Sequence, residues 1–195
     1  MPPLSDWLVY WNYVVLAALL LVAAVVDVRT GKIPNWLTYP AVAAGLVGHT
    51  LGGGLAGTEA QPLGLAGSLT GLAAGFLPMF AASMLGGIGG GDVKLVSAIG
   101  ALTGWRFTVS TMLFGLLIAA LMAIAIILHK RMFWDTMKRI GRFLYLTVTP
   151  AKPGSPTTEK SPKVPNGLAF CLGASVALVE VLLRGGEAPV LFLGI

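Results

Sequence analysis

Long apolar runs separated by short polar connections make up most of this 195-residue sequence. A helix needs about 20 largely apolar residues to cross the roughly 30 Å hydrocarbon layer of a bilayer. By that measure the pattern predicts about six transmembrane helices, of which the second and the fourth are short. The expected spans cover residues 8–26, 36–52, 63–85, 93–105, 108–128 and 167–184. We therefore expect an all-α, polytopic membrane protein.

The composition supports this fold class and excludes an ordinary soluble domain. Hydrophobic residues make up 56% of the chain and charged residues only 11%, and the mean hydropathy is +0.84. The most polar connection, residues 129–165, begins with apolar and basic residues alternating at a helical period, which predicts an amphipathic helix on the cytoplasmic side. A flexible linker rich in Pro, Lys, Ser and Thr follows. We expect residues 1–195 to form a single membrane-embedded domain.

The 13 lysines and arginines predict the orientation, because short cytoplasmic loops hold most basic residues of a membrane protein. With the N-terminus outside, only Arg106 and Arg184 fall on the outer side. The inner side receives Arg29, Lys32, Lys94, Lys130, Arg131, Lys138, Arg139, Arg142, Lys152, Lys160 and Lys163. This split favours six spans with the N-terminus outside.

Two aspartates, Asp27 and Asp92, adjoin apolar runs. An acid at the bilayer centre costs on the order of 3 kcal/mol, so ionisable residues in membrane segments are candidates for function. The predicted topology places Asp27 at the inner end of the first span and Asp92 at the inner entrance of the fourth. Both acids are therefore expected at one depth, where they can form a carboxylate pair.

Such a pair is the minimal apparatus for hydrolysing a peptide bond without a metal or a covalent nucleophile. Two neighbouring carboxylates cannot both ionise cheaply, so they share a proton and provide an acid and a base together. Gly89 and Gly91 allow irregular backbone beside Asp92 and close approach of a substrate. Lys94 either acts on the charge of the pair or anchors its helix at the interface. Asn35 either orients backbone near Asp27 or caps the second span.

The sequence gives no indication of a metal site or of a bound cofactor. The chain has one cysteine, Cys171, inside an apolar run, and two histidines without clustered acids. We expect no metal site and no cofactor.

These segments together resemble the type IV prepilin peptidases, membrane aspartic proteases related to the archaeal preflagellin peptidases. The first aspartate segment of that family is similar to Asp27-x-Arg29-x-x-x-Ile33-Pro34-Asn35, and its glycine-x-glycine-aspartate motif to Gly89-Gly90-Gly91-Asp92-Val93-Lys94. A third segment, Val164-Pro165-Asn166-Gly167-Leu168-Ala169, resembles the opening of the family's last helix, with Asn166 in place of the usual aromatic residue.

The resemblance implies that Asp27 and Asp92 are the catalytic pair, with Gly89 and Gly91 shaping the site. It implies a prepilin or pseudopilin substrate with a cytoplasmic leader, a Gly before the scissile bond and a hydrophobic helix after it. The cysteine-rich segment of bifunctional members is missing, so the chain resembles the compact type of tight-adherence (Flp) pili and related secretion systems, without methyltransferase activity or zinc. The expected location is the inner membrane, with the active site on its cytoplasmic side. Lipids are the other expected partners, nucleic acid is not, and the oligomeric state is open.

Other functions compete with this hypothesis. Buried acids also serve as proton relays, so Asp27 and Asp92 also suit a small proton-coupled transporter, although no internal repeat is present. A noncatalytic pilus-assembly protein is a further alternative, as is a protease of the signal-peptide-peptidase kind, which shares the second motif but cuts within a membrane helix.

Overall fold

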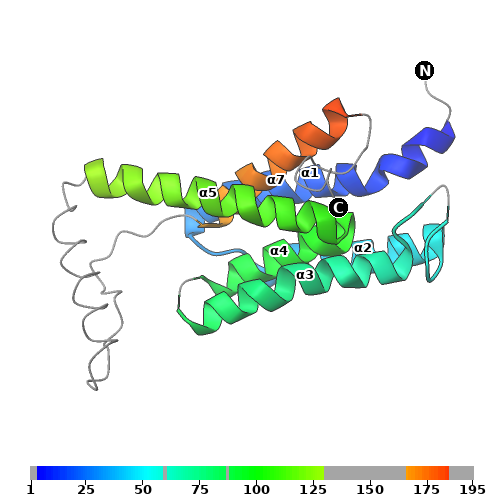
Figure 1. Ribbon diagram of the computed structural model, residues 1–195, viewed down its shortest axis with the longest axis horizontal. Coiled ribbons are helices and arrows are strands. Elements are labelled where there is room, and N and C mark those ends of the chain that lie inside the picture. Colours follow the sequence, from blue (N-terminus) through cyan, green and yellow to red (C-terminus); the bar gives the residue numbers. More distant parts are fainter. Residues whose placement is uncertain (1–3, 59–60, 87, 130–165, 185–195) are drawn as a thin grey trace. The chain divides into compact units, whose positions relative to one another are not determined.

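A computed structural model describes residues 4–58, 61–86, 88–129 and 166–184, and within these ranges it contains six α-helices and no strand (Figure 1). The helices are α1 (Leu4–Thr30), α2 (Asn35–Gly53), α3 (Gly64–Met84), α4 (Gly90–Thr103), α5 (Trp105–His129) and α7 (Asn166–Leu183). Each coincides closely with one predicted span, so the all-α prediction is confirmed. The predicted amphipathic helix and linker lie outside the described residues.

The chain divides into two compact units. The first comprises residues 1–118 and 165–195 and contains both aspartates. The second comprises residues 119–164, of which the structure describes the end of α5. The site below lies in the first unit, and the expectation of a single domain stays a prediction.

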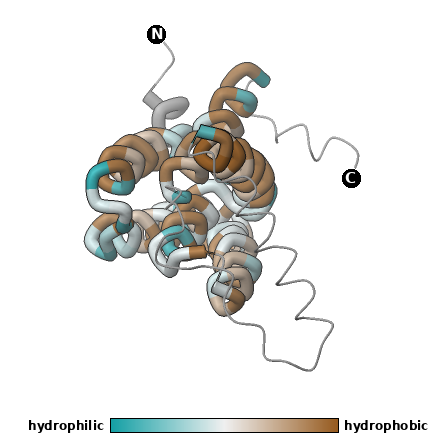
Figure 2. Tube along the Cα trace, turned by 90° about the vertical axis from the view of Figure 1, so that its left-hand side faces the viewer, coloured by the Kyte–Doolittle hydropathy of each residue, from teal (hydrophilic) through white to brown (hydrophobic). Residues whose placement is uncertain are grey.

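Four of the described helices are long and apolar enough to cross a membrane: α1 from Tyr10 onward, α3, α5 and α7. Hydrophobic residues run along most of the helical length, as the colours of Figure 2 show. The 14 residues of α4 rise only about 21 Å, less than the hydrocarbon thickness. The protein is therefore a multi-pass membrane protein, while membrane crossing by α2 and α4 and the orientation stay predictions.

The short helix α4 is almost entirely buried, with only Lys94 partly exposed between Asp92 and Thr103. Glycines on α2 and α3 let these helices approach it closely. A Cβ atom at Gly45 would lie 2.6 Å from the carbonyl oxygen of Ala101. Replacing Gly45 or other contact glycines with larger residues would therefore force α4 away from its neighbours.

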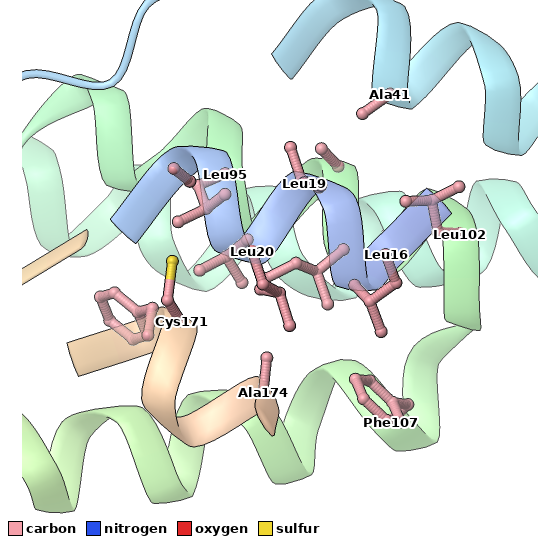
Figure 3. Packing of buried hydrophobic residues seen from close by; sticks show 14 of the residues in the cluster. Leu16, Leu19, Leu20, Ala41, Leu95, Leu102, Phe107, Cys171 and Ala174 are labelled. Atoms are coloured by element: carbon pink, nitrogen blue, oxygen red, sulfur yellow. The ribbon is translucent and has the colours of Figure 1, made fainter. Parts of the chain in front are cut away.

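Figure 3 shows the apolar core around α4, in which buried leucines of α1 lie beside Leu95 and Leu102 of α4, with Cys171 and Ala174 of α7 close by. Leu95 and Leu102 are fully buried. The same cluster includes Phe107 at the start of α5. This packing fixes α4 along its length.

Polar side chains hold the C-terminal end of α4, where helix carbonyls lack partners within the helix. Asn12 Nδ2 of α1 donates to the carbonyl oxygen of Leu102 at 3.0 Å, and His49 Nε2 of α2 lies 2.9 Å from the same oxygen. Ser68 Oγ of α3 donates to the carbonyl oxygen of Ala101 at 2.6 Å. Three helices thus hold the end of α4 opposite Asp92.

Candidate active site

Asp27 lies in the last turn of α1 with only 5% of its surface exposed. Its Oδ2 atom accepts a 2.8 Å hydrogen bond from the backbone N–H of Leu168, in the first turn of α7. The first N–H groups of a helix have no partner within it, so the carboxylate satisfies one of them across 141 residues of sequence. This bond fixes one oxygen of Asp27 as an acceptor.

Gly167 makes this approach possible because it has no side chain. A Cβ atom there would lie 2.8 Å from Asp27 Cγ, from Asp27 Oδ2 and from Ile33 Cδ1. Real Cβ atoms essentially never approach other atoms so closely. Sequence reasoning did not select Gly167 or Leu168 as site residues, although the third family-like segment contains both.

Asp92 lies in the first turn of α4 with 8% of its surface exposed. Its carboxyl accepts a hydrogen bond from the backbone N–H of Gly89, the N-cap residue. In return, the N–H groups of Asp92 and Val93 donate to the carbonyl oxygen of Gly89 at 3.0 and 3.3 Å. An acid at the third helical position that bonds the N-cap N–H is half of a capping box, so the local backbone holds Asp92 in place.

Ile33 connects the two aspartate segments. Its Cδ1 atom lies beside Gly167 and Asp27, while its Cβ and backbone nitrogen lie 3.3 Å from where a Cβ of Gly91 would be. The residue is buried. The turn after α1, the start of α4 and the start of α7 therefore meet at one point, which brings both predicted acids together with Gly89 and Gly91.

The electrostatics also couple the two acids. Asp92 lies outside the four helices that can cross the membrane. Burial, and to a smaller extent the negative charge of Asp27, raises its pKa from the ordinary 3.8 to about 6, although the hydrogen bond from Gly89 acts in the opposite direction. A carboxyl with this pKa holds its proton up to about pH 6, where an ordinary aspartate is already ionised.

Lys94 and Asn35 meet at the same end of α4 but pair with each other. Lys94 Nζ donates to Asn35 Oδ1 at 2.8 Å and lies 5.5 Å from the ring centroid of Tyr39. The N-cap of α2 is Pro34, so of the two roles considered for Asn35 the capping one is wrong, and the orientation of backbone near Asp27 stays a prediction. These two side chains link α2 to α4, and Lys94 lies two residues after Asp92.

No three His, Cys, Asp or Glu side chains gather as a metal site in the described part of the chain. The groups at this point of the fold include two electrostatically coupled carboxyls. An acid and an acceptor held by backbone groups suit the activation of a water molecule.

Known proteins similar to this chain include three prepilin leader peptidase/N-methyltransferases. That of Bacillus subtilis (strain 168) is 36% identical over 124 residues, which cover 61% of this chain and 46% of the relative. That of Klebsiella pneumoniae is 34% identical over 106 residues, covering 51% and 43%. That of Burkholderia pseudomallei (strain K96243) is 32% identical over 136 residues, covering 66% and 41%. The chain thus spans less than half the length of each of these relatives.

No solved structure is significantly similar to the chain. At the level of families, residues 14–127 match the type IV leader peptidase family. This match covers more than half of the chain and includes Asp27, Asp92 and the glycines around them. The chain therefore belongs to the type IV leader peptidase family.

Proposed function

We propose that this protein is a membrane aspartic endopeptidase that removes the cytoplasmic leader of prepilin-like substrates. It cuts after a Gly at the cytoplasmic membrane boundary, with water activated between Asp27 and Asp92. The observation that carries the proposal is that two buried and electrostatically coupled carboxyls lie at the N-termini of α7 and α4, which both pack against Ile33. The prepilin substrate class follows from the names of the relatives.

In this mechanism Asp27 is the base and Asp92 is the acid. Asp27 Oδ2 already accepts a hydrogen bond from Leu168, which suits an ionised carboxylate, and the raised pKa of Asp92 keeps the shared proton there. Asp27 takes a proton from water as the water oxygen attacks the scissile carbonyl carbon. Asp92 gives its proton to the departing nitrogen as the C–N bond breaks. The products are a carboxylic acid and an amine, without a covalent enzyme intermediate.

The glycines make room for an extended substrate beside the acids. A Cβ atom at Gly89 would lie 3.3 Å from Asp92 Oδ2, so a side chain there would crowd the carboxyl. Space next to a catalytic carboxyl lets a peptide backbone approach. We assign Gly89 and Gly91 to shaping this approach, and Lys94 with Asn35 to joining α2 and α4 beside it.

Asp→Asn exchange tests the proposal, because it keeps the shape of the side chain and removes its titration. Purified, detergent-solubilised wild type, Asp27→Asn and Asp92→Asn are incubated with a prepilin, and the cut site is identified by mass spectrometry. Glu180→Gln is the matched control, because Glu180 is paired with Arg184 at 3.6 Å on α7, away from the dyad. Wild type and Glu180→Gln should cut after Gly, and both aspartate variants should be folded but inert.

Full activity of either aspartate variant would contradict the dyad mechanism. If wild type cuts none of several prepilins, flux measurements in liposomes would test the proton-transporter alternative and pilus assembly assays the noncatalytic one. Cutting inside ordinary signal peptides would instead favour the signal-peptide-peptidase alternative. The same spectra report whether the new N-terminus is methylated, and we predict that it is not.

A further inference from the structure

An apolar groove lies between α1 and α7 and ends beside Asp27. It consists of two adjoining cavities of about 360 and 290 Å³. Ala24 of α1 lines both, so the two cavities adjoin at this residue. The first is also lined by Val28 and Leu168, and the second by Ala17 and Leu172. We call this feature the α1/α7 groove.

The α1/α7 groove has the length and spacing of a helix-binding surface. From Ala17 to Val28 it extends about 16 Å along α1, or three helical turns. The lining residues Ala17, Leu21, Ala24 and Val28 repeat every three or four positions and share one face of α1. Leu21 and Val28 are 68% and 62% exposed, so the walls of the groove are open to an occupant.

The inner end of the groove is connected to the catalytic pair. Leu168 lines the first cavity, and its backbone N–H is the group that donates to Asp27 Oδ2. Asp27 itself precedes the lining residue Val28 on α1. A polypeptide lying in the groove would therefore bring its cytoplasmic end to the acid.

The surroundings determine what kind of polypeptide fits. In hydrocarbon a chain must satisfy its backbone hydrogen bonds internally, so a single spanning segment is a helix. Small residues let helices approach closely, and Ala17 and Ala24 of α1 with Ser175 of α7 provide them here. Apolar walls at three- and four-residue spacing match the way an amphipathic or apolar helix enters a groove.

We propose that the α1/α7 groove binds the apolar helix of the substrate that follows the scissile bond. The helix lies antiparallel to α1, with its N-terminal end at Asp27. This inference rests on the proposed prepilin-peptidase function and adds where the substrate is recognised. Contacts along three helical turns of α1 then supply the binding energy that positions the scissile bond beside Asp27 and Asp92.

Two neighbouring alanines provide a matched test. Ala17 and Ala18 are both exposed on α1, but only Ala17 lines the groove. Ala17 lies ten residues, or about 15 Å, from Asp27, so it does not touch the reacting groups. Phe at position 17 would fill the groove, whereas Phe at position 18 would face lipid. We compare Ala17→Phe with Ala18→Phe on a full-length prepilin and on a short peptide that ends soon after the scissile bond.

Ala17→Phe should raise KM for the full-length prepilin about tenfold or more, because overfilling a packed contact is costly. It should leave cleavage of the short peptide unchanged, and Ala18→Phe should behave as wild type with both substrates. Equal KM values for the two variants and wild type would overturn the groove assignment. If the wild-type protein cleaves neither substrate, the proposed function itself is rejected. The two failures are therefore distinguishable.

Photocrosslinking provides a second measurement that does not depend on how Ala17→Phe folds. A benzophenone amino acid is placed at Leu172 in the groove, or at the exposed Phe76 of α3 as control, in the inactive Asp92→Asn protein. The Leu172 probe should crosslink to the apolar helix of the prepilin and the Phe76 probe should not. Crosslinks from Leu172 to lipid only would overturn the proposal.

Discussion

Gly167→Ala should damage catalysis through a contact that the structure defines closely. The added Cβ would lie 2.8 Å from Asp27 Cγ, Asp27 Oδ2 and Ile33 Cδ1, whereas ordinary van der Waals contact begins at 3.4 Å, so these atoms must separate by about 0.6 Å. The flexible end of Ile33 can rotate away. The Asp27 carboxylate cannot do so without weakening its hydrogen bond to Leu168.

The size of the effect follows from this displacement. Misplacing a reacting group by about 1 Å can cost on the order of 100-fold in rate. A shift of about 0.6 Å should therefore lower kcat about 10- to 100-fold. Overpacking costs typically 1–3 kcal/mol, so a modest fall in Tm should accompany it.

The assay is steady-state prepilin cleavage with Tm measured on the same preparations. Gly90→Ala is the matched control, because a Cβ at Gly90 meets no atom within 4 Å and alanine favours the helix. Gly91→Ala, whose Cβ would lie 3.3 Å from Ile33, should have a smaller effect than Gly167→Ala. If Gly167→Ala has the same kcat as the wild-type protein, the conclusion that this glycine positions Asp27 is refuted.

Four further predictions concern pH and the polar contacts. Because the pKa of Asp92 is about 6, kcat/KM should fall as pH rises beyond about 6 and the shared proton is lost, which a pH–rate profile measures. The pKa is raised above the ordinary 3.8, so the stability that protonated Asp92 provides is fully present below pH 3.8 and lost as pH rises through about 6. Asp92→Asn should accordingly be more stable than wild type at pH 7, by up to about 3 kcal/mol in denaturant titrations, and an equal or lower stability would contradict this. Lys94→Met and Asn35→Ala should each lower the free energy of unfolding by about 1 kcal/mol. Because the two side chains bond each other, the double variant should be no less stable than either single variant. The pH–rate profile should not change. A shifted profile for Lys94→Met alone would mean that its charge acts on the aspartates. His49→Ala should lower Tm without moving the pH profile, because its bond holds the far end of α4.

The helices could be predicted from the sequence because their signal is local. The apolar run predicted over residues 93–105 corresponds to Gly90–Thr103, and the run over 167–184 to Asn166–Leu183. Glycine and proline mark the ends of these runs. The placement of both acids at helix ends followed from the same pattern, since Asp27 and Asp92 stand where apolar runs stop and start.

The contacts that hold the acids could not be predicted in the same way. Leu168 donates a backbone N–H to Asp27, and nothing in its side chain indicates this role. Asn35 follows a proline at the start of α2, which suggests a cap, but its partner Lys94 is 59 residues away. A contact of this range depends on how α2 and α4 pack, which no local pattern contains.

The two acids share one structural principle that accounts for the glycine-rich signal. Asp27 receives a backbone N–H from the start of α7, and Asp92 receives one from the start of α4. In both places a glycine next to the acid, Gly167 or Gly89, leaves space for the carboxyl to approach the backbone. Backbone N–H groups therefore help to orient both acids in the part of the chain that the structure describes. We therefore predict that, besides the acids, the site is most sensitive to substitution at the residues without a side chain.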